Sequence, residues 1–87
     1  MATVWLETRV FVDVDTMNDV IMSFVKPLVD MFDRENLVES FHFFEENNDP
    51  HILFRVLAEE DKIVRRIRLA IMDKLRELGL TDVSRIS

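Results

Sequence analysis

The sequence has 87 residues, 48% hydrophobic residues and no cysteine, so it has room for one small packed core and excludes disulfides, thiol catalysis and cysteine-ligated zinc. The net charge of −6 is unevenly divided: residues 1–61 hold 4 basic and 14 acidic side chains (−10), and residues 62–87 hold 7 basic and 3 acidic (+4). Nonspecific nucleic-acid binding requires many cations to neutralise phosphates, so the acidic body of the chain disfavours it.

Residues 4–14 alternate in character, which is typical of a half-buried strand. One face is expected to carry Leu6, Thr8, Val10 and Val12. The other face then carries Trp5, Glu7, Arg9 and Phe11.

Apolar residues next recur at helical spacing over residues 17–32. Pro27 lies inside this pattern, where it lacks a backbone donor and clashes with the preceding turn. We therefore expect a kink near residues 23–26, or a helix divided there, and an end to the helix by Asn36.

Residues 37–45 and 51–57 are rich in β-formers and flank a polar Asn-Asn-Asp-Pro turn, which predicts a β-hairpin. If Ile52 and Phe54 enter the core, then His51, Leu53 and Arg55 point away from it. In the first hairpin strand, we expect Phe41 and Phe43 to point into the core, which leaves His42 and Phe44 on the outer face. A β-bulge would reverse part of this alternation.

A second helical pattern covers residues 63–78 and is followed by the only glycine, Gly79, in the position of a helix C-terminal cap. Residues 80–86 are expected to form a short final strand. The order β-α-β-β-α-β predicts an α+β, ferredoxin-like sandwich over residues 1–87, as one domain. Its four-stranded antiparallel sheet should have strand order 4-1-3-2, with both helices on one face.

The sheet face without helices is the main candidate surface. Its proposed binding residues are Trp5, Arg9, Phe11, His51, Leu53 and Arg55. A patch of aromatic, leucine and arginine side chains is apolar enough to suggest that a partner or ligand covers it. Three occupants are considered: a second copy or other protein, a single-stranded nucleic acid stacked on the aromatics, and a small molecule or peptide near His51 and Arg55.

Two further sets of side chains have weaker patterns. A basic helix face with Arg65, Arg66 and Arg68 is read as solvated, with nucleic-acid binding as the alternative. His42 and His51 lie near acidic residues of the turn, but their spacing matches no metal motif. We predict no metal, no cofactor and no catalytic residue, because catalytic triads and phosphate-binding glycine loops are absent from the sequence.

The chain carries a series of short motifs: Trp5-Leu6, Pro27-Leu28, Phe43-Phe44, Asp49-Pro50 and His51-Ile52-Leu53-Phe54-Arg55. Together they resemble the thiopeptide-type and lantibiotic-dehydratase C-terminal domain family. The resemblance covers most of this chain and the first portion of the family's larger domain, whose basic residues help to eliminate glutamate from a glutamylated peptide. The chain departs from that pattern at Glu45-Glu46-Asn47-Asn48, which replace an arginine and a tyrosine, and at Leu53, which replaces a strand arginine.

These observations favour a non-catalytic binding or assembly domain that uses the open sheet face for self-association or for a protein or peptide partner. The alternative is a subunit of a peptide-modifying, dehydratase-like system in which His51 and Arg55 hold a carboxylate. A single-stranded RNA-binding module is the third reading. With no secretion-signal pattern and no long apolar run, we expect a cytoplasmic protein with no membrane span.

Overall fold

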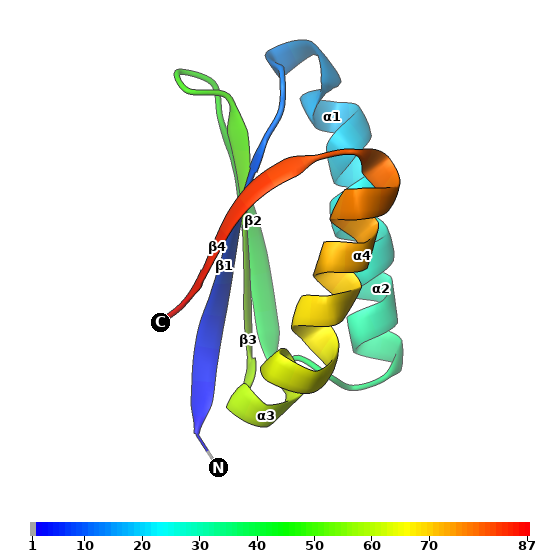
Figure 1. Ribbon diagram of the computed structural model, residues 1–87, viewed down its shortest axis with the longest axis vertical. Coiled ribbons are helices and arrows are strands. Elements are labelled where there is room, and N and C mark those ends of the chain that lie inside the picture. The colour runs from blue at the N-terminus through cyan, green and yellow to red at the C-terminus, as the bar shows by residue number, and fades with distance from the viewer. Residues whose placement is uncertain (1) are drawn as a thin grey trace.

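The computed structural model describes residues 2–87 as a four-stranded sheet with helices packed beside it (Figure 1). The strands are β1 (Thr3–Phe11), β2 (Ser40–Glu46), β3 (His51–Glu59) and β4 (Thr81–Ile86). The main helical elements are α1 (Met17–Val20) and α2 (Lys26–Arg34) after β1, and α3 (Glu60–Lys62) and α4 (Arg68–Leu78) after β3. The predicted order β-α-β-β-α-β is therefore confirmed.

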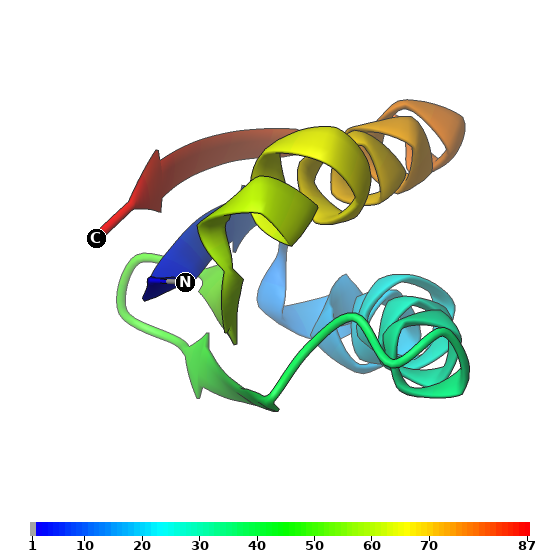
Figure 2. The same cartoon turned by 90° about the horizontal axis from the view of Figure 1, so that it is seen from below.

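Every strand pair is antiparallel, and the spatial order is β2-β3-β1-β4. This is the predicted order 4-1-3-2 counted from the other edge. Figure 2 shows that both helical segments lie on the same side of the sheet, so the ferredoxin-like α+β sandwich is confirmed. No helix of residues 2–87 covers the opposite side of the sheet, which is called the open face below.

The predicted phase of β1 is confirmed, although the strand ends at Phe11 rather than residue 14. Leu6, Thr8 and Val10 are buried beneath the helices. Their partners on β3 are Val56, Phe54 and Ile52, all of them buried as well. Because directly opposite residues of an antiparallel pair point to the same face, the intervening residues of both strands face the open side.

The first helical segment is continuous but irregular. A 3₁₀ turn, Val14–Thr16, leads into α1, and a π-helical turn, Ile21–Val25, connects α1 to α2. Pro27 occupies the first turn of α2. Proline cannot donate to the carbonyl one turn earlier, and a wider π turn is one way for a helix to accommodate such a defect. The irregularity predicted near residues 23–26 thus takes the form of a π turn, without a break.

The second helical segment also contains a π turn, Ile63–Ile67, which the sequence did not predict. Its end follows the prediction. Gly79 has φ of 67° and donates to the carbonyl of Arg76, while the N–H of Leu80 donates to the carbonyl of Leu75 at 2.9 Å. These two bonds are those of a Schellman motif, and they place Gly79 at C′.

The core lies between the helices and the covered face of the sheet. Its largest fully buried side chains include Phe24, Phe32, Phe54, Ile63 and Ile67. Phe24, in the first π turn, meets Phe54 edge to face, with ring centroids 6.0 Å apart. No helix within residues 2–87 is long and apolar enough to cross a membrane.

Strand β2 lies at the edge of the sheet, and like the other edge strand, β4, it has no buried residue. Phe41 is opposite Val56 and Phe43 is opposite Phe54, so both point to the helix side, as predicted. They nevertheless remain 41% and 38% exposed. The predicted facing is therefore confirmed over β2, but these two aromatics lie at the margin of the core instead of inside it.

Candidate binding surface on the open sheet face

The open face consists of the side chains that point away from the helices. These are Trp5, Glu7, Arg9 and Phe11 on β1, His51, Leu53, Arg55 and Leu57 on β3, His42 and Phe44 on β2, and Val83 and Arg85 on β4. All six candidate residues of the sheet thus share one face. Six further side chains share this face: Glu7, His42 and Phe44, which the alternation of their strands predicts to point outward, and Leu57, Val83 and Arg85.

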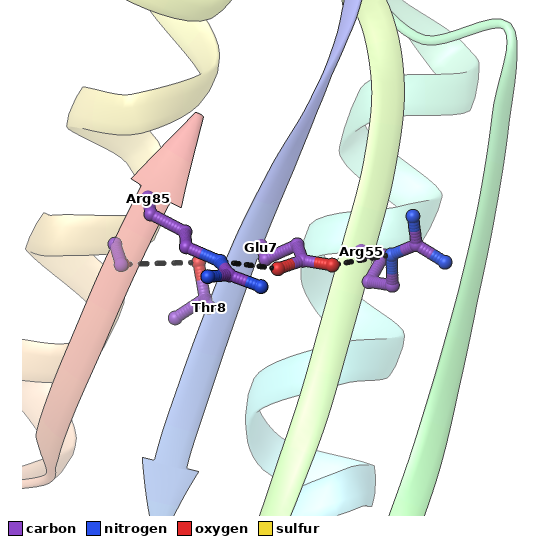
Figure 3. Close-up of polar contacts among 5 residues, drawn as sticks. Glu7, Thr8, Arg55 and Arg85 are labelled. Atoms are coloured by element: carbon purple, nitrogen blue, oxygen red, sulfur yellow. Dashed lines mark hydrogen bonds and ion pairs between the residues drawn. The ribbon is translucent and has the colours of Figure 1, made fainter. Parts of the chain in front are cut away.

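Glu7 is the electrostatic centre of this face (Figure 3). The Nε of Arg85 donates a hydrogen bond to its Oε2 at 2.8 Å. The Nε of Arg55 lies 3.0 Å from its Oε1, but the Arg55 N–H is not directed at that oxygen and makes no hydrogen bond within residues 2–87. The Glu7 side chain is only 16% exposed, so this carboxylate is screened less than a surface group.

The surrounding arginines change the acidity of Glu7. The hydrogen bond from Arg85 lowers the pKa of Glu7 below its ordinary value, and the charges of Arg85, Arg55 and Arg9 act in the same direction. Burial opposes them by raising the pKa, but the arginines prevail. Glu7 is therefore held as a carboxylate, and the cluster of one acid and three arginines has a net positive charge.

Aromatic rings extend from Glu7 towards β2. The guanidinium carbon of Arg55 lies 4.4 Å from the ring centroid of Trp5, which is a cation–π contact. Trp5 meets His42 edge to face at 5.0 Å, and His42 meets Phe44 in the same way at 5.4 Å. Trp5, His42 and Phe44 thus form an aromatic row on this side of the face. Phe44, at the outer end of the row, is 50% exposed.

The other half of the face contains a shallow hollow of about 160 Å³. It is lined by Glu7, Arg9, Leu53, Val83 and Arg85. Arg85 is 75% exposed, and among residues 2–87 no carboxylate lies within 4.0 Å of the Arg9 guanidinium. Two guanidinium groups with spare donors beside apolar walls are suited to a carboxylate on a short apolar stem.

His51 and Phe11 lie at the end of the face next to the hairpin turn. Their rings are 6.2 Å apart, and His51 Nδ1 lies 2.6 Å from the carbonyl oxygen of Asp49. His51 and Arg55 are four residues apart on one strand, a separation of about 13 Å. The Arg55 guanidinium lies over Trp5, at the end of the face away from His51, and His51 lies beside Phe11. In this arrangement a joint role of His51 and Arg55 requires a ligand that extends along the strand.

The basic helix residues lie in the helical layer, away from the open face. Arg65 pairs with Asp61 at 3.0 Å, and Arg66 pairs with Glu35. Both guanidinium groups are therefore partly neutralised, and Arg68 remains exposed beside them. Within residues 2–87, no group of three histidine, aspartate or glutamate side chains is arranged to hold a metal ion.

The pairing of Glu7 with its arginines is the part of this face that the sequence pattern did not predict. Alternation along a strand gives its two faces, but it does not say which residue lies opposite which. The register pairs Glu7 with both Arg55 and Arg85, and Arg9 with both Leu53 and Val83. A charge-complementarity search between the first and last strands was the available signal, since Arg85 is the only basic residue of β4.

Comparison with protein families gives one finding that covers nearly the whole chain. The model of the lantibiotic biosynthesis dehydratase C-terminal family matches residues 5–85. Comparisons with curated proteins and with solved structures find no match. The match begins at Trp5 and ends at Arg85, so it includes the open face and both helical segments.

Proposed function

Because the chain belongs to the lantibiotic biosynthesis dehydratase C-terminal family, we propose that it is a subunit of a peptide-modifying system. In this proposal, the open sheet face binds the peptide that the system modifies. The role is binding and positioning, and the chemistry is supplied elsewhere in the system.

The observation that carries the proposal is the excess of guanidinium groups around Glu7. One carboxylate faces three arginines, Arg9, Arg55 and Arg85, and within residues 2–87 its one side-chain hydrogen bond comes from Arg85. Arginine presents paired N–H donors that match the geometry of a carboxylate. A glutamate or glutamyl group on a peptide is therefore a chemically suitable ligand for the hollow beside Arg9.

The composition of the face favours binding over catalysis. Leu53 forms an apolar wall of the hollow, at the position where the family resemblance has a strand arginine. The two histidines lie apart from the hollow, since His42 contacts Trp5 and His51 contacts Phe11. Neither histidine lines the hollow, so the direct contacts that the hollow offers to a ligand are those of arginine, carboxylate and apolar side chains.

The test is a titration of the protein with a capped peptide that carries a glutamylated serine, monitored by the arginine side-chain NMR resonances. We expect Arg9 and Arg85 to shift saturably and the unmodified peptide to bind more weakly. Arg9→Gln should weaken binding about tenfold, the equivalent of one charge-assisted hydrogen bond. Arg65→Gln is the matched control, because it removes the same charge from the helical layer.

Two results would contradict this proposal. In the first, the glutamylated and unmodified peptides bind equally. In the second, Arg65→Gln weakens binding as much as Arg9→Gln does, which would show that only the overall charge matters.

Self-association through the open face is a second candidate, and exposed apolar groups favour it. Val83 is 60% exposed and Phe44 is 50% exposed, on opposite margins of the face. Interfaces between copies are enriched in aromatic and arginine side chains of this kind. Light scattering of the wild type should then give a dimer that Trp5→Ala and Arg55→Glu dissociate, and a monomer in all three would dismiss this candidate.

A further inference from the structure

We propose that edge strand β2 binds an extended, cationic segment of a partner polypeptide as a fifth strand of the sheet. β2 pairs with β3 on one side, and its other side pairs with no strand within residues 2–87. Its outward backbone N–H and carbonyl groups are therefore available to a further strand. Strand addition to a free sheet edge is a recurring way to bind an extended peptide.

Exposed aromatics on both faces of β2 would contact the side chains of an added strand. On the helix side, Phe41 is 41% exposed and Phe43 is 38% exposed, while Phe44 is 50% exposed on the open side. An added strand presents its side chains alternately to the two faces, so it covers all three rings at once. Apolar or β-branched residues are expected at the central positions of the bound segment.

Acidic side chains at both ends of β2 specify the charge of the partner. Glu39 immediately precedes the strand, and Glu45 and Glu46 end it. All three are exposed, and none forms an ion pair with a basic side chain of residues 2–87. A segment with lysine or arginine at each end would complement them.

The same acidic residues argue against a second copy at this edge. A symmetric antiparallel pair of β2 strands would bring Glu39 of each copy close to Glu45 and Glu46 of the other. Like charges opposite one another destabilise strand pairing, and natural sheets use charged residues to protect their edges from self-association. Charge therefore favours a basic partner over self-pairing.

A hollow beside the start of β2 provides space for a long basic side chain. It has a volume of about 410 Å³, and its lining includes Asp33, Glu39 and Phe41. Asp33 and Glu39 are exposed acids from different elements, and Phe41 supplies an apolar wall. The methylene stem of a lysine or arginine can lie along such a ring while its charged head reaches the carboxylates.

The other edge strand, β4, is also unpaired on its outer side within residues 2–87 and exposes Val83 and Ile86, but it lacks the aromatic rings and the acidic ends of β2. β4 carries Asp82 and Arg85, which have opposite charges, and Arg85 is already bonded to Glu7. A charged peptide segment would therefore gain no net electrostatic attraction at β4. The preference for β2 does not depend on the proposed role of the Arg9 hollow, which is lined by residues of β1, β3 and β4 and by none of β2.

The test uses a capped peptide in which valine and threonine alternate between pairs of lysines, and a matched peptide flanked by glutamates. Trp5 is the only tryptophan and contacts His42 of β2, so its fluorescence reports on this edge. We expect saturable binding of the lysine peptide, weakened by salt, with slowed amide exchange in β2 and not in β4. The glutamate peptide should bind at least about tenfold more weakly.

Charge reversal gives the decisive comparison. The variant Glu45→Lys/Glu46→Lys should lose the lysine peptide and gain the glutamate peptide, while Asp73→Lys/Glu77→Lys, with the same change of net charge on α4, should behave as wild type. Equal binding of both peptides, protection of β4 instead of β2, no binding at all, or self-association abolished by the β2 variant would each overturn the proposal.

Discussion

Arg85 of the last strand and Glu7 of the first are joined by a hydrogen bond of 2.8 Å, directly across the β1–β4 pair. The bond connects the two ends of the chain at the centre of the open face. It also fixes the charge of Glu7, because it is the main reason why the pKa of this carboxyl lies below its ordinary value. The stability of the fold should therefore depend on pH through this pair.

The sign of that dependence follows from linkage. The folded pKa of Glu7 is lower than the unfolded one, about 4.3, so its contribution is fully present above the unfolded value. It is lost as the pH falls through the folded pKa. Urea unfolding measured from pH 6 downwards should show the wild type losing more stability in acid than Glu7→Gln does.

Glu77→Gln is the matched control, since Glu77 is an exposed acid whose one ion-pair partner in the described part of the chain is Lys74, on the same helix. Its acid sensitivity should equal that of the wild type. If Glu7→Gln and wild type lost stability in parallel, the pair would have no energetic role.

The two helical segments end in the same way, which makes a second prediction. Gly79 has φ of 67° and Asn36 has φ of 54°, and each precedes a leucine whose N–H bonds back to the helix. Only backbone strain opposes a Cβ at Gly79, because no atom lies within 4 Å of one placed there. Gly79→Ala should cost about 1 kcal/mol of unfolding free energy, and Asn36→Ala a similar amount. Asn36→Gly should cost little, and chemical denaturation can measure all three.

Thr8 is the one buried polar residue among residues 2–87, and its hydroxyl lies 3.2 Å from that of Ser84. Ser84 also has an acceptor in Asp82 at 2.8 Å, so removing the Thr8 hydroxyl leaves no donor of Ser84 unsatisfied. Thr8→Val should therefore change the unfolding free energy by less than about 1 kcal/mol. A loss above 2 kcal/mol in thermal or urea unfolding would show that the hydroxyl is essential to the sheet.

The strand phases and the cap at Gly79 could be predicted because each has a local cause. Alternation allows only two assignments of the side chains to the two faces of the sheet. The apolar residues Leu6 and Val10, which are buried, decide between them. The capping glycine is equally local, since few other residues take positive φ without strain. These features needed no knowledge of which strands are neighbours.

The π turns and the charge cluster could not be predicted in this way. The apolar pair Ile63 and Ile67 fits an ordinary α-helix as well as the π turn that contains it. Arg85 gains its importance only from the register that places it opposite Glu7. Both depend on how elements pack in three dimensions, whereas a sequence pattern records one element at a time.

The stacked pair of Trp5 and Arg55 makes the last prediction. The guanidinium carbon lies 4.4 Å from the ring centroid, and the Arg55 side chain is 26% exposed, so water weakens the contact only in part. A double-mutant cycle of Trp5→Leu and Arg55→Met should give a coupling of about 0.5–1 kcal/mol. Arg85 still satisfies Glu7 when Arg55 is removed, so Arg55→Met should cost less than the loss of both arginines.

The matched cycle pairs Trp5→Leu with Arg65→Met, because Arg65 lies in the helical layer and ion-pairs with Asp61. Its coupling should be zero within error. If the Arg55 cycle were also zero, the guanidinium would be held by Glu7 alone, and the ring would serve only as an apolar floor. A coupling that persists in high salt would identify apolar contact with the ring as its main source, since salt weakens the electrostatic attraction between the charge and the ring.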